Sequence, residues 1–327
     1  MKLEFSYCPG TLALGGKGYS RTCLNRVFNG RSVSPILPYA SPFESIKGPN
    51  YFDDNRERIS ISGVQEKYSL VLLKNKLRLS KEGELSQYLL KPIPAYGKNA
   101  DQMPANEHLT MQLARQVFGI ETAENALIFF QDGSPAYITK RFDRGNNKER
   151  FAHEGFAMLA KRTPQTDGQH YKYKGNYLDL FNILKAYVPA YPVEAVKLMK
   201  LLLFNYLFSN GDAHLKNFAI LETPMGDHRL SPDYDLLNTR IHIEDPVFAL
   251  EEGLLPKSMA KGKMRNQFER LALEAGINLV FFKEILDDML DGTKEVDRLI
   301  EASFLNERTK RNYWQAYQTR LKRLLKT

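Results

Sequence analysis

The stretch Asn210-Gly211-Asp212-Ala213-His214-Leu215-Lys216-Asn217 decides which fold and which chemistry we expect of this chain. It follows the most apolar run of the sequence, residues 198–208, and precedes the acidic motif Ser231-Pro232-Asp233-Tyr234-Asp235. The two motifs have the spacing that phosphoryl transfer with magnesium requires. An aspartate is followed by an asparagine five positions later and by another aspartate about 18 residues beyond. The stretch is therefore a candidate catalytic loop.

The acidic and amide side chains of this region have separate expected roles. Asp212 is the candidate group that orients a substrate hydroxyl and accepts its proton. Asn217 and Asp235 are the candidate Mg²⁺ ligands, because hard oxygen donors suit this ion and phosphate oxygens and water complete its shell. Asp233 is the alternative ligand, but the apolar pair Leu236-Leu237 after Asp235 suits an anchored loop.

Two basic side chains lie within the same loop. Lys216 could steady the transferring phosphoryl group by its charge, and we group it with Asp212 as a catalytic candidate. His214 could contact the bound nucleotide, or it could be a structural histidine that forms hydrogen bonds within the loop. The sequence leaves both alternatives open for His214.

The composition is that of an ordinary soluble globular protein. A length of 327 residues, with 43% hydrophobic and 26% charged residues, allows one large domain or two lobes. The absence of a long apolar run and of a secretory signal predicts a cytoplasmic protein without a membrane partner. Two cysteines, Cys8 and Cys23, are too few for a disulfide framework or an all-cysteine zinc site. The net charge of +8 favours acidic partners without choosing among nucleotides, nucleic acid and acidic proteins.

Residues 1–58 have weak periodicity and many turn signals, so we expect an N-terminal extension and connector there. Gly15-Gly16-Lys17-Gly18 fits no phosphate-binding fingerprint and predicts a turn. Residues 59–143 predict a small sheet with one helix. Leucine or valine recurs every four residues within the expected helix, 104–118. The expected strands are 68–73, 88–91, 126–130 and 136–140.

Residues 144–327 are predicted to be mainly helical, with short strands near Asn217 and Leu230. The expected helices are 154–161, 177–187, 193–208, 266–275, 280–290 and 306–325. A small sheet-rich lobe followed by a larger helical lobe is an α+β arrangement typical of the protein-kinase-like fold. In this interpretation residues 59–143 form the N-lobe and residues 144–327 form the C-lobe with the catalytic loop. The fold alone would not establish the function.

A small-residue turn precedes the first expected strand and could cradle phosphates. It reads Ser60-Ile61-Ser62-Gly63-Val64-Gln65-Glu66-Lys67, and Ser60, Ser62, Gly63 and Lys67 are the candidate nucleotide contacts. Backbone N–H groups point outward from such a turn because no bulky side chain covers them. A polar surface loop is the alternative interpretation.

Lys91 ends an expected strand beneath this turn and could reach the nucleotide phosphates. Glu107 lies on the next expected helix, sixteen positions later, and could pair with Lys91 as the strand lysine and helix glutamate of kinases do.

The segment Lys140-Arg141-Phe142-Asp143-Arg144 falls where the two lobes would join. There the backbone at Lys140 could bind an adenine edge, Phe142 could stack or pack nearby, and Asp143 could reach the ribose. An edge strand ending in a salt-bridged Arg-Asp-Arg turn is an equally good interpretation.

In this order, the motifs resemble those of the HipA-like serine/threonine kinases, the toxins of type II toxin–antitoxin systems. Six ordered motifs between residues 59 and 240 carry the resemblance: 60–67, 89–92, 106–108, 140–144, 210–218 and 233–236. The phosphate turn contains one glycine, which suits this family but not the spaced glycines of eukaryotic kinases. Lys140 stands where many relatives have an acidic residue, so its part in adenine recognition would use only the backbone.

The resemblance implies an ATP- and Mg²⁺-dependent kinase that phosphorylates protein hydroxyls, with an aminoacyl-tRNA synthetase as one possible target. It also implies autophosphorylation of the turn, at Ser60 or Ser62. The chain is short at its start and so resembles the split form HipT, whose missing subdomain is a separate small protein. A helix-turn-helix antitoxin is the other expected partner, and DNA would be contacted only indirectly, through that antitoxin.

Two other classes of function fit some of the same features. A non-catalytic kinase-fold subunit of a DNA-binding antitoxin or repressor complex would use the basic C-terminal helix, although a solvated face is the simpler explanation of that helix. Its basic residues are Arg308, Lys310, Arg311, Arg320, Lys322 and Arg323. A small-molecule or lipid kinase would share the same site chemistry.

Overall fold

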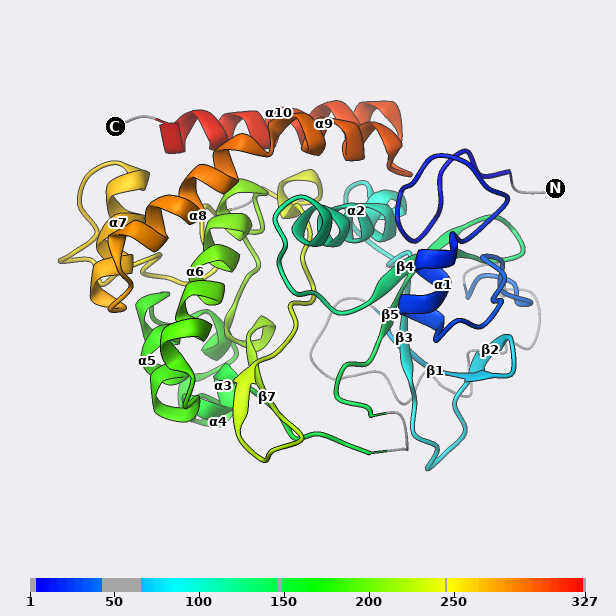
Figure 1. The fold of residues 1–327 in the computed structure, drawn as a ribbon, viewed down its shortest axis with the longest axis horizontal. Coiled ribbons are helices and arrows are strands. Elements are labelled where there is room, and N and C mark those ends of the chain that lie inside the picture. Colours follow the sequence, from blue (N-terminus) through cyan, green and yellow to red (C-terminus); the bar gives the residue numbers. More distant parts are fainter. Residues whose placement is uncertain (1–3, 43–65, 146–148, 245, 326–327) are drawn as a thin grey trace.

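The computed structural model describes residues 4–42, 66–145, 149–244 and 246–325. Figure 1 shows a sheet-rich lobe beside a larger helical lobe. The turn residues Ser60, Ser62 and Gly63 lie outside the described residues. Within the described part of the chain, no helix is both long enough and apolar enough to cross a membrane.

The N-lobe is built on an antiparallel sheet with strand order β2-β1-β3-β5-β4 among the described residues. Its strands are β1 (Tyr68–Leu73), β2 (Lys76–Leu79), β3 (Tyr88–Pro92), β4 (Asn125–Phe129) and β5 (Pro135–Lys140). Every residue of β4 is buried, because the sheet is covered on both faces there. Leu127 and Phe129 face the main core, while Ala126 and Ile128 face a second, smaller core.

Helix α2 (Met103–Gln116) packs against β4 and β5 on the side of the main core. Pro104 lies in its first turn, where a missing N–H costs nothing, and the predicted span of 104–118 agrees closely with the observed helix. The short helix η3 (Ala100–Gln102) leads into it.

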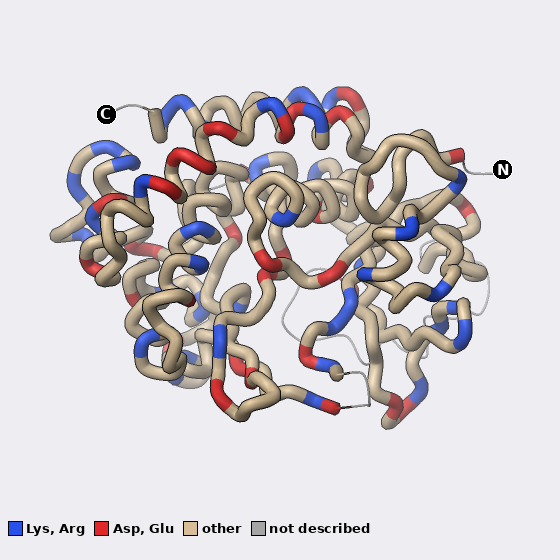
Figure 2. The backbone as a smooth tube through the Cα atoms, viewed as in Figure 1, with Lys and Arg blue, Asp and Glu red and all other residues tan. Residues whose placement is uncertain are grey.

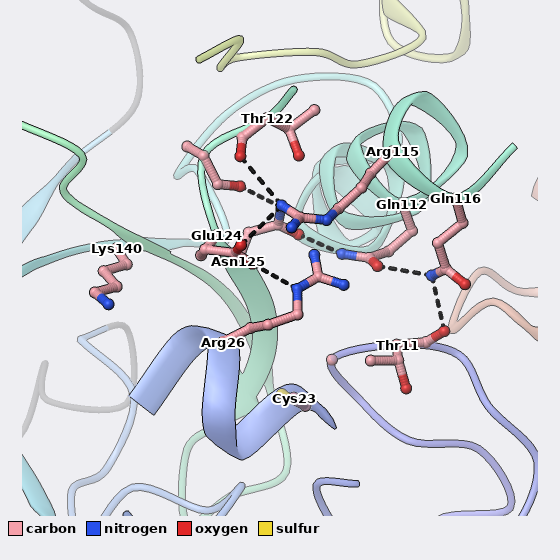
Figure 3. A network of polar contacts seen from close by, with 12 residues as sticks. Thr11, Cys23, Arg26, Gln112, Arg115, Gln116, Thr122, Glu124, Asn125 and Lys140 are labelled. Carbon is pink, nitrogen blue, oxygen red and sulfur yellow. Dashed lines mark hydrogen bonds and ion pairs between the residues drawn. The ribbon is translucent and has the colours of Figure 1, made fainter. Parts of the chain in front are cut away.

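The N-terminal segment packs onto the other face of the sheet. Helix α1 (Arg21–Phe28) begins at Ser20, whose hydroxyl accepts the Cys23 N–H, and its buried side chains enter the smaller core. Figure 3 shows how this segment is tied to α2 and β4. Arg26 and Arg115 both bind Glu124, at 2.9 and 2.8 Å. The region expected only as an extension therefore supplies part of the N-lobe core.

The C-lobe surrounds α6 (Tyr191–Leu207), which contains most of the apolar run noted in the sequence and is buried over most of its length. Helices α5, α8 and α10 pack on it. The C-lobe helices are α3 (Phe156–Leu159), α4 (Pro164–Asp167), α5 (Leu178–Tyr187), α6, α7 (Met264–Glu274), α8 (Leu279–Asp291), α9 (Thr293–Ala302) and α10 (Glu307–Leu325). Helix α9 was not predicted, and the helix expected at 154–161 is only α3.

A smaller antiparallel sheet, with order β6-β7-β8, flanks the candidate catalytic loop. Its strands are β6 (His153–Gly155), β7 (Ala219–Glu222) and β8 (His228–Leu230), and the last two match the short strands expected near Asn217 and Leu230. The short helices η4 (Tyr171–Tyr173), η5 (Leu215–Asn217) and η6 (Thr239–Ile241) complete the lobe.

Helices α9 and α10 connect the two lobes. Figure 1 shows them along one edge of the molecule, above α2, and α9 packs against α2 directly. Tyr313 of α10 and Thr110 of α2 share a hydrogen bond of 2.8 Å between their hydroxyl groups. The C-terminal helices therefore support the helix that carries Glu107.

Candidate active site

The loop 210–217 begins where α6 ends. Ser209 adopts a left-handed backbone with φ +54°, and the Asn210 N–H donates to the carbonyl of Asn205 at 2.8 Å. This bond across six residues is the pattern that closes many helix C-termini. The sequence folds this way because the apolar run stops at Phe208 and polar residues that favour turns follow.

Lys91 joins the N-lobe to the loop after β8. It lies on β3, is 4% exposed, and donates through Nζ to Glu107 Oε1 at 2.6 Å. The same Nζ also donates to Asp235 Oδ1. The ion pair between Lys91 and Glu107, which the order of the motifs predicts, is present in the structure, and Asp235 is a second partner of the same lysine.

The charges of this cluster set its protonation states. Burial alone would lower the pKa of Lys91, but Asp235 and Glu107 outweigh it and raise that pKa above its usual value. Burial would raise the pKa of Asp235, whereas Lys91 and Lys67 lower it to about 2. Burial raises the pKa of Glu107, an effect that Lys91 partly offsets. At neutral pH Lys91 is therefore a cation and Asp235 is an anion.

The backbone conformation of Asp235 and the side chains around it are typical of a functional residue. Its φ is +55°, a conformation that costs energy for a residue other than glycine and is concentrated at functional sites. Asn217 Nδ2 donates to Asp235 Oδ2 at 3.5 Å, and Lys67 Nζ lies 4.0 Å from the same oxygen. Asn217 and Asp235 therefore converge, as their spacing predicted, and Lys67 lies beside them.

The oxygen donors of Asn217 and Asp235 fit a magnesium ion bound together with nucleotide phosphates. Mg²⁺ usually takes one or two protein carboxylates and completes its shell with phosphate oxygens and water. Asn217 Oδ1 accepts the His214 N–H at 3.2 Å and, as a carbonyl oxygen, keeps a second lone pair. Among the described residues, no group of three or more His, Cys, Asp or Glu side chains could hold a metal ion. Phosphate oxygens and water would therefore have to complete the magnesium shell.

Asp212 is held by a residue that the sequence did not suggest. The hydroxyl of Tyr173, on η4, donates to Asp212 Oδ1 at 2.9 Å. The Tyr173 ring also lies edge-on to His214, with ring centroids 5.2 Å apart. Burial and then the charge of Asp212 raise the pKa of Tyr173, so its hydroxyl keeps its proton and remains a donor. Tyr173 therefore orients the candidate base.

The His214 side chain is enclosed within the protein. The side chain is buried, its Nδ1 has no hydrogen-bond partner within the described ranges, and burial lowers its pKa to about 4. His214 is therefore neutral at pH 7, and its backbone N–H contributes to the loop by binding Asn217. Lys216 is partly exposed, and burial, followed by the charges of Lys172 and Lys67, lowers its pKa.

The segment between the lobes forms hydrogen bonds within the N-lobe and within its own turn. Lys140 Nζ donates to Asn29 Oδ1 at 2.6 Å, and the Lys140 N–H donates to the Glu124 carbonyl. That N–H is therefore already occupied within the N-lobe. Asp143 binds Arg141 through both carboxylate oxygens, at 3.0 and 2.7 Å, and also Arg144 at 2.8 Å. The salt-bridged Arg-Asp-Arg turn, the alternative drawn from the sequence, is the arrangement observed.

Phe142 belongs to an aromatic cluster at the same junction. Its ring lies 5.1 Å from that of His153 and 5.7 Å from that of Tyr234, measured between centroids. The Tyr234 hydroxyl donates to the Lys216 carbonyl at 3.0 Å. The cluster therefore packs directly beside the catalytic loop.

Asp233 is not part of this convergence. It is buried, its backbone pairs with residues 121 and 123, and burial raises the pKa of its carboxyl group well above the usual value. These contacts fix Asp233 as part of the turn that carries Asp235.

The protein has a kinase-like α+β fold of two lobes. Its site joins a lysine from a strand to a glutamate from a helix, and an aspartate–asparagine–aspartate set lies between the lobes. The fold is shared with HipA of Shewanella oneidensis MR-1, solved in complex with HipB and operator DNA. The TM-score is 0.59 at 21% identity, covering 84% of this chain and 66% of that one.

Sequence comparison places the chain within a family. The model of the HipA-like C-terminal domain matches residues 59–296, which is well over half of the chain. The protein therefore belongs to the HipA-like kinase family.

Two curated relatives share part of their length with this chain. "Putative kinase Y4mE" of Sinorhizobium fredii is 29% identical over 253 residues, which cover 75% of this chain and 57% of that protein. "Serine/threonine-protein kinase toxin HipA" of Shewanella oneidensis is 28% identical over 205 residues, covering 58% and 45%. The chain thus spans about half the length of these relatives.

Proposed function

We propose that the protein is an ATP- and Mg²⁺-dependent serine/threonine protein kinase. The observation that carries this proposal is the convergence on Asp235. The carboxylate meets Lys91, which is paired with Glu107, and it lies beside Asn217 and Lys67. A purely structural cluster would not need two lysines and an amide around one strained aspartate.

Each residue then has a role in the transfer of the γ-phosphoryl group of ATP. Lys91 and Lys67 bind phosphate oxygens, and Glu107 fixes the direction of Lys91. Asp212, oriented by Tyr173, accepts the proton of the substrate hydroxyl as its oxygen attacks the γ-phosphorus and the bond to the β-phosphate oxygen breaks. Lys216 lies on the same loop and can stabilise the charge on the transferring group. A magnesium ion held by Asn217 and Asp235 would neutralise charge on the phosphates.

We further propose that the protein acts as the toxin of a type II toxin–antitoxin system. The family membership supports this, as does the relative named as a kinase toxin. By analogy, its partners would be a helix-turn-helix antitoxin, which would contact DNA, and a second small protein. The solved complex of HipA with HipB and operator DNA supports an antitoxin partner. Its target would be a protein such as an aminoacyl-tRNA synthetase.

Autophosphorylation at Ser60 or Ser62 is the regulatory part of the proposal. A phosphate would bring about −1.5 to −2 charges into a turn that must bind ATP phosphates, so it should disfavour nucleotide binding. Intact-mass measurement of the wild type and of Asp212→Gln tests this. We expect added phosphate only on the wild type, and equal phosphorylation of the two proteins would exclude self-modification.

Substrate identity requires a separate experiment. Purified protein and labelled ATP are incubated with a bacterial lysate, and the labelled protein is identified by mass spectrometry. We expect a protein band whose label disappears with Asp212→Gln and persists with Asp287→Asn, an exposed control on α8. Label confined to lipids or small molecules would instead indicate a kinase of another substrate class.

The DNA-binding alternative has less support from α10 than the sequence indicated. Arg320 is 3% exposed and lies over the Tyr206 ring, 5.0 Å from its centroid, so it cannot face DNA. Lys310 pairs with Glu307 at 3.0 Å. Part of the expected basic face is therefore used within the protein.

A further inference from the structure

A cavity of about 240 Å³ opens where the loop before α2, the short helix η6 and α10 meet. Its lining carries three cationic side chains, those of Lys98, Arg240 and Arg308. The remaining lining residues are uncharged, and they are Asn99, Ile241, Asn312, Gln315, Ala316 and Thr319. Among the residues that the structure describes, the cavity thus has cationic and polar walls without an acidic side chain.

Nearby carboxylates are engaged elsewhere. Glu307 precedes Arg308 but binds Lys310 at 3.0 Å, and Asp101 accepts from Gln102 at 2.6 Å. Within the described ranges, the three cations of the cavity form no ion pair with a carboxylate. Like charges gathered in a concave site raise the local concentration of anions. Figure 2 shows further lysine and arginine positions along α10.

The size and chemistry of the cavity select the kind of anion. Drug-sized ligands occupy pockets of roughly 300–1,000 Å³, so this cavity suits a smaller group than a whole nucleotide. Arginine presents a planar fork of N–H donors that matches phosphate oxygens, and the side-chain amides of Asn312 and Gln315 can donate further hydrogen bonds. A single phosphoryl group fits these constraints.

The walls of the cavity are hydrogen-bonded to one another and to α2. Asn99 Nδ2 donates to the Ile241 carbonyl at 2.9 Å, and His242 Nδ1 lies 3.0 Å from the Lys98 carbonyl. The other ring nitrogen of His242 lies 2.8 Å from Asn106 Nδ2, one residue before Glu107 on α2. A ligand that holds the walls together would therefore also hold α2.

The same walls reach the catalytic loop. Thr239, next to Arg240, accepts the Gly211 N–H at 2.9 Å through Oγ1 and donates to the Ser209 carbonyl at 3.0 Å. Gly211 immediately precedes Asp212. The residues next to the cavity lining are thus hydrogen-bonded both to α2 and to the catalytic loop, the two elements whose relative position the kinase chemistry depends on.

We propose that this cavity binds a phosphoryl group, either as inorganic phosphate or as a phosphate ester, and that binding stabilises α2 in the position that keeps Glu107 on Lys91. The binding itself stands on the cavity alone. Its effect on phosphotransfer rests on the proposed kinase function.

Calorimetric titration of the full chain with inorganic phosphate, pyrophosphate and O-phosphoserine, at constant ionic strength, tests the proposal. Arg308→Gln should weaken the binding by about tenfold or more, because it removes charge-assisted hydrogen bonds. Arg311→Gln is the matched control, since it removes the same charge from an exposed position of α10 outside the cavity lining. If Arg308→Gln fails to fold, Arg240→Gln tests the same prediction.

The variant Lys91→Gln separates this cavity from the kinase cleft. Binding that survives Lys91→Gln and is lost in Arg308→Gln supports the proposal. Binding of inorganic phosphate without phosphoserine would identify a free anion as the ligand, and binding of both would show that an ester is accepted. No binding by the wild type at millimolar concentration, or equal weakening by Arg308→Gln and Arg311→Gln, would overturn it. A chain that binds phosphate but transfers none from ATP would contradict the kinase function alone.

Discussion

Replacing Tyr173 by phenylalanine removes one hydroxyl group and changes little else. The hydroxyl donates to Asp212 Oδ1 at 2.9 Å, whereas the contact of the ring with His214 does not depend on it. The variant therefore isolates the orientation of the candidate base from the packing of the loop. We expect slower phosphate transfer by a protein of nearly unchanged stability.

The size of the effect follows from the bond that is lost. A hydrogen bond to a charged group contributes about 1.5–3 kcal/mol. Tyr173 is only half-buried, so water can partly replace its hydroxyl and the lower value applies. If this energy is lost from the orientation of Asp212 in the transition state, kcat falls about tenfold. The KM for ATP should stay within about twofold, because the ATP-binding residues are untouched.

Steady-state phosphate transfer at varied ATP, together with calorimetric Tm, measures both quantities. Tyr171→Phe, on the same short helix η4, is the matched control, because the Tyr171 hydroxyl group forms no hydrogen bond with any of the residues that the structure describes. An unchanged kcat in Tyr173→Phe would refute the positioning role. So would an equal fall in kcat with Tyr171→Phe, since that would indicate a general disturbance of η4.

Three further predictions concern α2. Glu107→Gln should lower kcat/KM at least about tenfold and the free energy of unfolding by about 1–3 kcal/mol, because Lys91 loses a buried charged partner but keeps Asp235. Phosphate transfer by this variant at the wild-type rate would contradict the pairing. His108 is fully buried, and burial lowers its pKa from the ordinary 6.5 to about 4. The stability that the neutral His108 contributes is therefore fully present above pH 6.5 and is lost as the pH falls toward 4. His108→Asn should therefore flatten the fall in unfolding free energy over that range by up to about 1.4 kcal/mol per pH unit, and parallel denaturation profiles for the two proteins would exclude this. Tyr313→Phe should cost about 1 kcal/mol in urea unfolding, because Thr110 loses one of its hydrogen bonds, and a neutral outcome would show that the bond between α10 and α2 adds nothing.

Features with a local signature in the sequence were predictable. The strand Tyr68–Leu73 was predicted with its observed bounds, because a short run of aromatic, leucine and β-branched residues is typical of a strand. The pairing of Lys91 with Glu107 was predictable because a strand lysine followed by a helix glutamate is the order found in kinases. The convergence of Asn217 and Asp235 followed from their spacing in the chain.

Features that depend on tertiary contacts were not predictable. Tyr173 reaches Asp212 from 39 residues away in the sequence, and nothing in its own short helix marks it. Helix α1 has only eight residues, too few to show a clear period, and its role in the core depends on the sheet it covers. From the sequence, Asp143 was equally compatible with ribose binding and with an ion pair, and the structure shows its carboxylate bound by both Arg141 and Arg144.

Phosphate transfer from labelled ATP by purified Asp235→Gln protein tests the central claim most directly. The substitution removes the carboxylate on which Lys91, Lys67 and Asn217 converge, and Asp287→Asn on the surface of α8 serves as the control. We predict that the wild type and Asp287→Asn transfer phosphate to protein in the presence of Mg²⁺, and that Asp235→Gln, folded by circular dichroism, transfers none. Transfer by Asp235→Gln at the wild-type rate would contradict the assignment of this cluster as the catalytic site of a kinase.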